Sequence, residues 1–121
     1  MVQNHSLEQV PPEDFKRVCT LFRALSDPTR LRLVLALSGR EQTVGELVEA
    51  LEQPQSTVSR HLALLRQSRV VQTRREAARV HYRLEDTHLS ALVIEAFSHA
   101  EHERQELPDH STVLPSSEDA L

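Results

Sequence analysis

Four side chains of the kinds that bind transition metals lie near the end of the sequence, in two pairs. Asp86 and His88 form a D-x-H pair, and after ten intervening residues His99 and His102 form an H-x-x-H pair. Each residue of an α-helix turns by about 100°, so His99 returns to within about 20° of His88 and His102 to within about 40°. The three imidazoles therefore share one face of a predicted helix.

One chain cannot close a metal site with both pairs. A helix rises about 1.5 Å per residue, which separates His88 from His99 by about 16 Å, whereas a zinc–nitrogen bond is only about 2.0–2.1 Å long. Two such helices packed antiparallel about a twofold axis would bring Asp86 and His88 of one copy to His99 and His102 of the other. One carboxylate and three imidazoles suit tetrahedral Zn(II), and Co(II) accepts the same set. The sequence therefore predicts two equivalent sites in a homodimer.

The same helix carries an apolar stripe. Its apolar residues recur at helical spacing, at Leu89, Leu92, Val93, Ala96 and Phe97. We expect this stripe to pair the two helices, and we expect the helix to begin at Asp86 or Thr87 and to run to about Leu107.

Four more helices and a β-hairpin are predicted before this last helix. Pro11 and Pro12 open the first helix, and Asp27 caps the second, which Gly39 closes. A capping box, Thr43 with Glu46, starts a third helix. A tight turn then leads to a fourth helix from about Gln55 to Arg69. Strand-like residues at 70–71 and 80–82 flank a charged tip at 74–79.

Two short helices joined by a tight turn indicate a helix-turn-helix, whose second helix enters the major groove of DNA. The N-terminal part of the fourth helix is polar on one side and apolar on the other. Arginines at the hairpin tip suit phosphates or the minor groove. The predicted DNA-binding residues are Gln55, Ser56, Thr57, Ser59, Arg60, His61, Arg74, Arg75 and Arg79.

The charge distribution supports a nucleic-acid partner although the net charge is −4. Residues 54–83 hold seven arginines and one acid, Glu76, whereas residues 95–121 hold seven acids and one arginine, Arg104. One basic and one acidic region in the same chain is typical of a protein that binds a charged partner.

Length and composition predict one small domain of 121 residues. We expect a flexible arm at residues 1–10, a winged helix-turn-helix domain with dimerisation helices at 11–107, and a disordered acidic tail at 108–121. No signal peptide or membrane span is recognisable, and the single cysteine, Cys19, excludes an intrachain disulfide. These features favour a cytoplasmic protein, with Cys19 as a small buried hydrophobic residue.

Four stretches resemble the winged-helix repressors of the ArsR/SmtB family. They are "LFRALSDPTRLRLVLAL", "TVGELVEAL", "PQSTVSRHLALLRQSRVV" and "RREAARVHYRL", and the similarity covers residues 15–102. The resemblance implies a mainly α fold with a β-hairpin, in the order α-α-α-α-β-β-α. It also implies a homodimer that binds a palindromic operator and leaves it when a metal binds.

The resemblance also bears on the metal. Asp86, His88, His99 and His102 match the last-helix site of the family's zinc and nickel/cobalt sensors. The family's other site needs an E-L-C-V-C motif, but residues 41–45 read E-Q-T-V-G, which disfavours As(III), Cd(II) and Pb(II). Nickel/cobalt sensors extend the shell, so Glu101 and His110 are possible extra ligands and His5 offers a further nitrogen. In the family, the equivalent of His99 also hydrogen-bonds a backbone carbonyl near Arg69.

Three function classes compete. The first is a repressor that Zn(II) or Co(II) releases from DNA, with a Ni(II)/Co(II) sensor as its variant. The second is a metal-independent winged-helix regulator whose histidines are incidental. The third is a zinc hydrolase, which the sequence disfavours because it reads H-A-E-H instead of H-E-x-x-H, and because four protein ligands leave no position for water. We therefore expect a regulator and not an enzyme.

Overall fold

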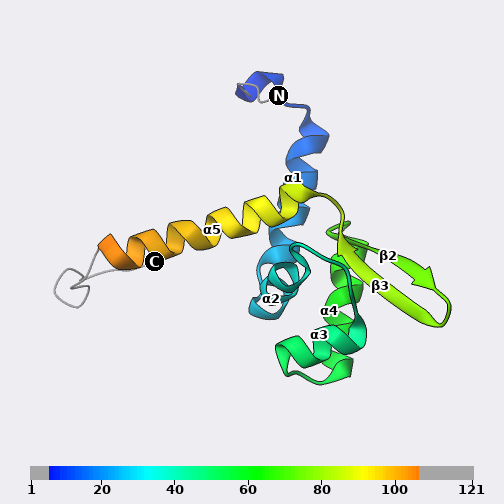
Figure 1. The fold of residues 1–121 in the computed structure, drawn as a ribbon. Helices are drawn as coiled ribbons and strands as arrows, with labels where there is room; N and C mark the ends of the chain where they lie inside the picture. The colour runs from blue at the N-terminus through cyan, green and yellow to red at the C-terminus, as the bar shows by residue number, and fades with distance from the viewer. Residues whose placement is uncertain (1–5, 107–121) are drawn as a thin grey trace.

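The computed structural model describes residues 6–106, and these form a bundle of helices with a projecting hairpin (Figure 1). The elements are η1 (Leu7–Gln9), α1 (Pro12–Leu25), α2 (Pro28–Leu37), β1 (Gln42–Thr43), α3 (Val44–Leu51), α4 (Gln55–Gln67), β2 (Val71–Glu76), β3 (Arg79–Leu84) and α5 (Thr87–Glu106). The predicted order of helices and hairpin is confirmed, with β1 and η1 as additions. The predicted tail at 108–121 and part of the predicted arm lie outside the described residues.

Local sequence sets the helix starts as predicted. The Asp27 carboxylate accepts a hydrogen bond from the backbone N–H of Arg30, and Pro28 occupies the first position of α2. Thr43 and Glu46 form both hydrogen bonds of a capping box at the start of α3. Each bond satisfies a backbone N–H that has no partner within the helix.

The sheet is larger and its turn tighter than expected. β3 lies between β1 and β2 in an antiparallel sheet, and the two-residue strand β1 was not predicted. Strand pairing reaches Glu76 opposite Arg79, so the turn contains only Ala77 and Ala78. Most of the predicted charged tip therefore belongs to the strands, where residues alternate between the two faces of the hairpin.

The core lies between α2, α3, α4, the base of the hairpin and the first half of α5. The fully buried large side chains are Leu33, Val34, Leu47, Val58, Leu62, Leu65, Val70, Val71 and Val93. Leu89 and Val93 of α5 belong to this core, so two of the five stripe residues attach α5 to its own domain. The expectation that the whole stripe pairs two helices is wrong for these two residues.

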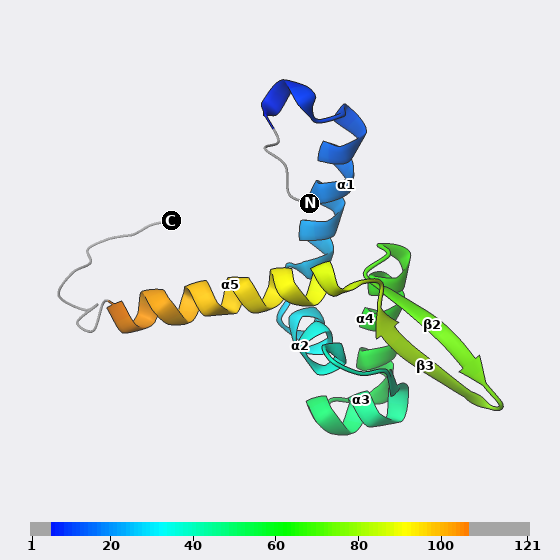
Figure 2. The same cartoon turned by 45° about the horizontal axis from the view of Figure 1, so that its top comes forward.

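Two helices project from the body and leave apolar side chains uncovered in the single chain. Figures 1 and 2 show α5 extending to the side opposite the hairpin, with α1 standing apart from α3 and α4. The exposed large apolar residues of these two helices are Phe15, Val18, Phe22, Ile94 and Phe97. Cys19 is exposed on α1, so its predicted burial is wrong for the single chain.

Candidate metal and nucleic-acid sites

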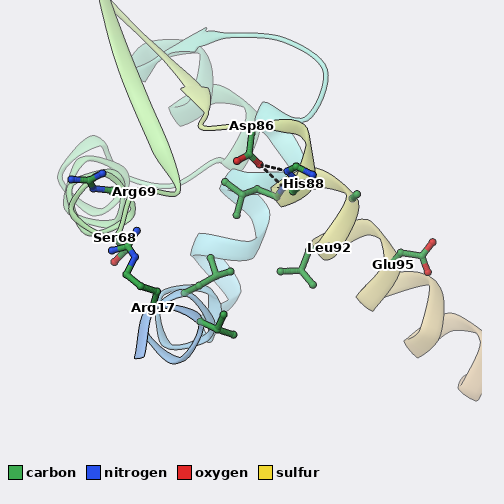
Figure 3. Close-up of a pocket in the computed structure, with 11 residues that line it drawn as sticks. Arg17, Ser68, Arg69, Asp86, His88, Leu92 and Glu95 are labelled. Carbon is green, nitrogen blue, oxygen red and sulfur yellow. Dashed lines mark hydrogen bonds and ion pairs between the residues drawn. The ribbon is translucent and has the colours of Figure 1, made fainter. Parts of the chain in front are cut away.

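Asp86 and His88 lie together at the start of α5. Asp86 Oδ1 accepts a hydrogen bond from the Leu89 N–H at 3.3 Å and lies 3.5 Å from His88 Nδ1 (Figure 3). Asp86 is thus the residue that caps α5. The His88 side chain is 94% exposed and that of Asp86 is 56% exposed, so both keep oxygen or nitrogen atoms open to solvent.

His99 and His102 lie on the last turns of α5. Their side chains are 73% and 66% exposed, and each Nε2 faces a carboxylate one turn further along the helix. His99 Nε2 lies 3.7 Å from Glu103 Oε2, and His102 Nε2 lies 3.1 Å from Glu106 Oε2. Both imidazoles therefore lie on the helix surface beside a carboxylate, where an exposed contact contributes little and leaves the rings accessible to another ligand.

Within residues 6–106 of one chain, no three His, Cys, Asp or Glu side chains gather as a metal site. The chemistry of the two pairs still fits a borderline metal ion, since together they supply one carboxylate and three imidazoles. Glu101 accepts a hydrogen bond from Gln105 Nε2 at 3.4 Å. The other proposed extra ligands, His5 and His110, lie outside the described residues.

An apolar hollow of about 630 Å³ adjoins the Asp86–His88 pair. It is bounded by α1, the end of α4 and the start of α5, and Figure 3 shows Asp86, His88, Leu92 and Arg69 around it. The start of the candidate metal site and the end of the helix-turn-helix therefore border one open space.

Arg69 follows the end of α4, just after the C-cap Ser68, and has a left-handed conformation with φ +62°. The Val70 N–H donates to the Leu65 carbonyl and the Arg69 N–H to the Arg66 carbonyl, which is the Schellman arrangement at a helix end. Glycine usually occupies this position because other residues are strained there.

The first turns of α4 carry the predicted DNA-binding side chains as an open row. Gln55, Ser56, Ser59 and Arg60 are exposed and Thr57 is half-buried, while Val58 on the inner side is fully buried. Four hydrogen-bonding side chains are thus free to meet base edges or phosphates.

His61 is not part of that row. Its side chain is buried, and its Nδ1 lies 3.2 Å from Nη1 of Arg30 and 3.7 Å from Oδ2 of Asp27. The prediction that His61 contacts DNA is therefore wrong, because the side chain would have to leave the interior to reach DNA. The spacing could have revealed this, since His61 lies three residues after Val58 and four before Leu65, on the core side of α4.

The wing arginines differ from one another. Arg74 is bound by Glu41, with Nη2 2.6 Å from Oε1, and by Glu76, with Nη1 3.3 Å from Oε1. Arg75 and Arg79 are exposed, and no ion pair within the described part of the wing involves them. Arg75 and Arg79 remain candidates for DNA phosphates, whereas Arg74 is already neutralised by carboxylates.

Hydrogen bonds hold three carboxylates in their ionised form. The Arg30 backbone N–H lowers the pKa of Asp27, and the Thr43 backbone N–H lowers the pKa of Glu46. The Arg74 guanidinium lowers the pKa of Glu41. Each partner stabilises the charged form of the carboxyl group.

Comparison with known proteins places this geometry in a family. The model of the family described as "Bacterial regulatory protein, arsR family" matches residues 27–73. The HTH-type transcriptional regulator KmtR of Mycobacterium tuberculosis is 41% identical over 103 residues, covering 85% of this chain and 79% of the relative. The chain belongs to the ArsR/SmtB family.

Other relatives and solved structures agree. The HTH-type transcriptional repressor SmtB of M. tuberculosis is 42% identical over 90 residues, covering 74% of this chain and 67% of the relative. The structure of HlyU from Vibrio cholerae has a TM-score of 0.66 at 35% identity, over 71% of this chain and 94% of that one. The repressor BigR from Xylella fastidiosa has a TM-score of 0.63 at 35% identity, over 74% and 95%. The predicted winged helix-turn-helix is thus confirmed.

The family match gives the helix-turn-helix its role. ArsR-family members with this fold are transcription regulators that bind DNA, which confirms the expected class of partner. No helix within residues 6–106 is long and apolar enough to cross a membrane.

Proposed function

We propose that this chain is a metal-responsive transcriptional repressor that acts as a homodimer. The observation that carries the proposal is the placement of Asp86 and His88 at one end of α5 and of His99 and His102 at the other, all open to solvent. Two relatives are named for related roles: a cadmium resistance regulatory protein homologous to CadC and an arsenical resistance operon repressor.

The uncovered apolar surface supports dimerisation through α1 and α5. Phe15, Val18 and Phe22 on α1 are each about half exposed, as is Phe97 on α5. Large apolar side chains that gather on the exposed face of a helix often mark a protein–protein interface. A twofold pairing of α5 would cover this area and would also join the two halves of each metal site.

Asp86, His88, His99 and His102 would then hold Zn(II), or Co(II). When bound, the ion would supply four directional bonds between the two α5 helices and would thereby favour one dimer shape over another. Regulation requires this preference, because a ligand with equal affinity for both dimer shapes does not shift the equilibrium between them. The apo dimer would bind a palindromic operator, with α4 in the major groove and the wing on the backbone.

The hollow beside His88 offers a route from the metal site to the DNA-reading helix. The partner subunit's His99 would enter near Asp86, and the residues at the end of α4, including Arg69, border the same space. We propose that the ring nitrogen of His99 that does not bind metal donates to a backbone carbonyl near Arg69. That bond would fix the end of α4 relative to the partner's α5.

A DNA-binding titration tests the function. A labelled duplex of the chain's own promoter is titrated with apo protein, and the titration is repeated with Zn(II), Co(II) and Ni(II). We expect tight binding by the apo dimer and loss of affinity at one Zn(II) or Co(II) per chain. Unchanged affinity with all three metals would overturn metal sensing and favour a metal-independent regulator.

The rival metal is Ni(II), through an expanded shell that includes Glu101 and His110. The same titration with Glu101→Gln and His110→Ala separates the two sensors. If either substitution weakens the response to Ni(II) and not the response to Zn(II), the expanded shell is the operating site. If both responses are unchanged, the four-residue site is sufficient.

A further inference from the structure

Four charged or titratable side chains form a cluster on one face of the wing. They are Glu41, just before β1, Arg74 and Glu76 of β2, and His81 of β3. His81 is the register partner of both Arg74 on one side and Thr43 on the other. The cluster therefore joins β2 and β3 to the segment just before β1, with His81 in the middle.

The Arg74–Glu41 contact is the strongest in the cluster. Arg74 Nε lies 3.2 Å from Oε1 and 3.1 Å from Oε2 of Glu41, and Nη2 lies 2.6 Å from Oε1. A bidentate arginine–carboxylate pair has a defined orientation as well as a charge interaction. Because 33 residues separate the two partners, this pair ties the outer strand of the wing to the segment that leads into α3.

His81 and Glu76 complete the tie. His81 Nε2 lies 3.5 Å from Glu76 Oε1 and its Nδ1 lies 4.0 Å from Glu41 Oε1. The His81 side chain is only 19% exposed, so the cluster is shielded in part from water. Arg74 would have to leave two carboxylates to reach a phosphate.

Arg75 lies on the opposite face of β2 from Arg74, because neighbouring strand residues alternate. Its register partner is Val80. Arg79 is the first residue of β3, beside the turn, and its register partner is Glu76, so Arg79 lies on the same face as Arg74. These two arginines project from a strand pair that the Arg74–Glu41 contact holds in place.

We propose that Arg74 is a positioning residue, which fixes the angle of the wing through Glu41 and leaves Arg75 and Arg79 to contact DNA. This inference rests on the proposed DNA-binding function. The sequence alone predicts that Arg74 contacts DNA, whereas this proposal gives it an indirect role. It also means that Glu41, although an acid, promotes DNA binding.

The two roles of Arg74 predict opposite effects of Glu41→Gln. If Arg74 contacts phosphate, removing its competing carboxylate frees it and raises operator affinity. If Arg74 positions the wing, Glu41→Gln lowers affinity by up to about fivefold, the upper range for an exposed ion pair. Arg74→Gln should lower affinity equally, and the double variant should be no weaker than either single one.

Salt dependence provides a second readout. Each lost phosphate contact reduces the slope of log affinity against log salt by about 0.9. Arg75→Gln should show this change, whereas Arg74→Gln should keep the wild-type slope. Glu49→Gln, on the exposed side of α3, controls for the general effect of removing an acid.

The measurement is fluorescence anisotropy of the apo homodimer on operator DNA at four salt concentrations, with melting temperatures to confirm folding. A rise in affinity with Glu41→Gln beyond that of Glu49→Gln would overturn the proposal, as would a lower slope with Arg74→Gln. Should the wild-type protein fail to bind DNA at all, the proposed function itself would be wrong, which is a different outcome.

Discussion

His61 Nδ1 lies 3.2 Å from Nη1 of Arg30, and this contact joins the middle of α4, the proposed DNA-reading helix, to the start of α2. Arg30 Nε also donates a hydrogen bond to the Ala24 carbonyl, and the Arg30 backbone N–H donates to the capping Asp27 carboxylate. One arginine therefore connects the end of α1, the start of α2 and α4. The position of α4 depends on this polar contact as well as on apolar packing.

His61→Ala is expected to destabilise the fold. It leaves Nη1 of Arg30 without its His61 partner and opens space beside Leu62, at a cost of about 1–3 kcal/mol in the free energy of unfolding. Urea denaturation measures this cost. Gln55→Ala, on the exposed side of the same helix, is the control and should change stability by less than about 0.5 kcal/mol. Equal stability of the two variants would show that the contact is dispensable.

Mixing two inactive variants tests whether the metal site is shared between copies. His88→Ala removes one ligand from one half of each site and His102→Ala removes one ligand from the other half, so each homodimer should bind zinc weakly. A heterodimer of the two retains one complete site and should bind about one Zn(II). Metal titration of the remixed, refolded pair measures this. Binding no better than that of the separate variants would place the site within one chain or nowhere.

His99→Gln should separate metal binding from regulation. The variant loses one ligand and also the ring N–H that is proposed to reach the backbone near Arg69. We therefore expect the metal-dependent fall in operator affinity to disappear, even at zinc concentrations that saturate the variant. Zinc affinity and operator affinity are measured on the same preparation. Normal release of DNA by the metallated variant would exclude this route.

Asp27 should contribute stability that depends on pH. Its pKa is lowered in the folded protein by the Arg30 backbone N–H, so folding favours the ionised form. The contribution is complete above the pKa of the unfolded chain, near 3.8, and is lost as the pH falls through the lower folded value. Asp27→Asn keeps a capping oxygen but cannot titrate. Below about pH 4, its free energy of unfolding should fall less steeply than that of the wild type.

Arg69→Gly is expected to stabilise the protein. A residue other than glycine in the left-handed conformation costs about 1–2 kcal/mol, and glycine would relieve this cost. Glycine also has greater freedom in the unfolded chain, which destabilises the folded state by about 0.5–1 kcal/mol. The net gain should be about 0.5–1 kcal/mol in thermal or urea unfolding. Arg69→Ala keeps the strained backbone and should show no gain. A destabilised glycine variant would mean that the Arg69 side chain contributes more than the strain costs.

Helix starts that depend on hydrogen bonds between neighbouring residues could be predicted from the sequence. Asp27 ahead of Pro28, and Thr43 three residues before Glu46, determine helix starts through hydrogen bonds that span only three positions. The stripe on α5 was visible too, but its spacing could not tell Leu89 and Val93, buried in the chain's own core, from the exposed Phe97.

Features that depend on distant partners were not predictable. The sequence alone predicts that Arg74 binds DNA, because its partner Glu41 is distant in the chain. Strand β1 has only two residues, which is too short for an alternating hydrophobic pattern. His61 was predicted to contact DNA because imidazole is polar, although its spacing from Val58 and Leu65 places it on the core side of α4. The metal site stays a prediction, since its two halves lie at opposite ends of one helix and no single chain unites them.

The Glu85 N–H donates a hydrogen bond to the Val70 carbonyl at 2.9 Å. This bond links the segment before α5 to the segment between α4 and β2. Asp86 follows Glu85 and Arg69 precedes Val70, so the base of the wing, the end of α4 and the first proposed metal ligand, just before α5, meet at a single corner. A small rotation of α5 about that corner would swing the distant hairpin tip through a much larger arc. Operator DNA would thus sense an angular change through the long arm of a lever whose pivot combines this hydrogen bond with the packing of Leu89 and Val93 in the core.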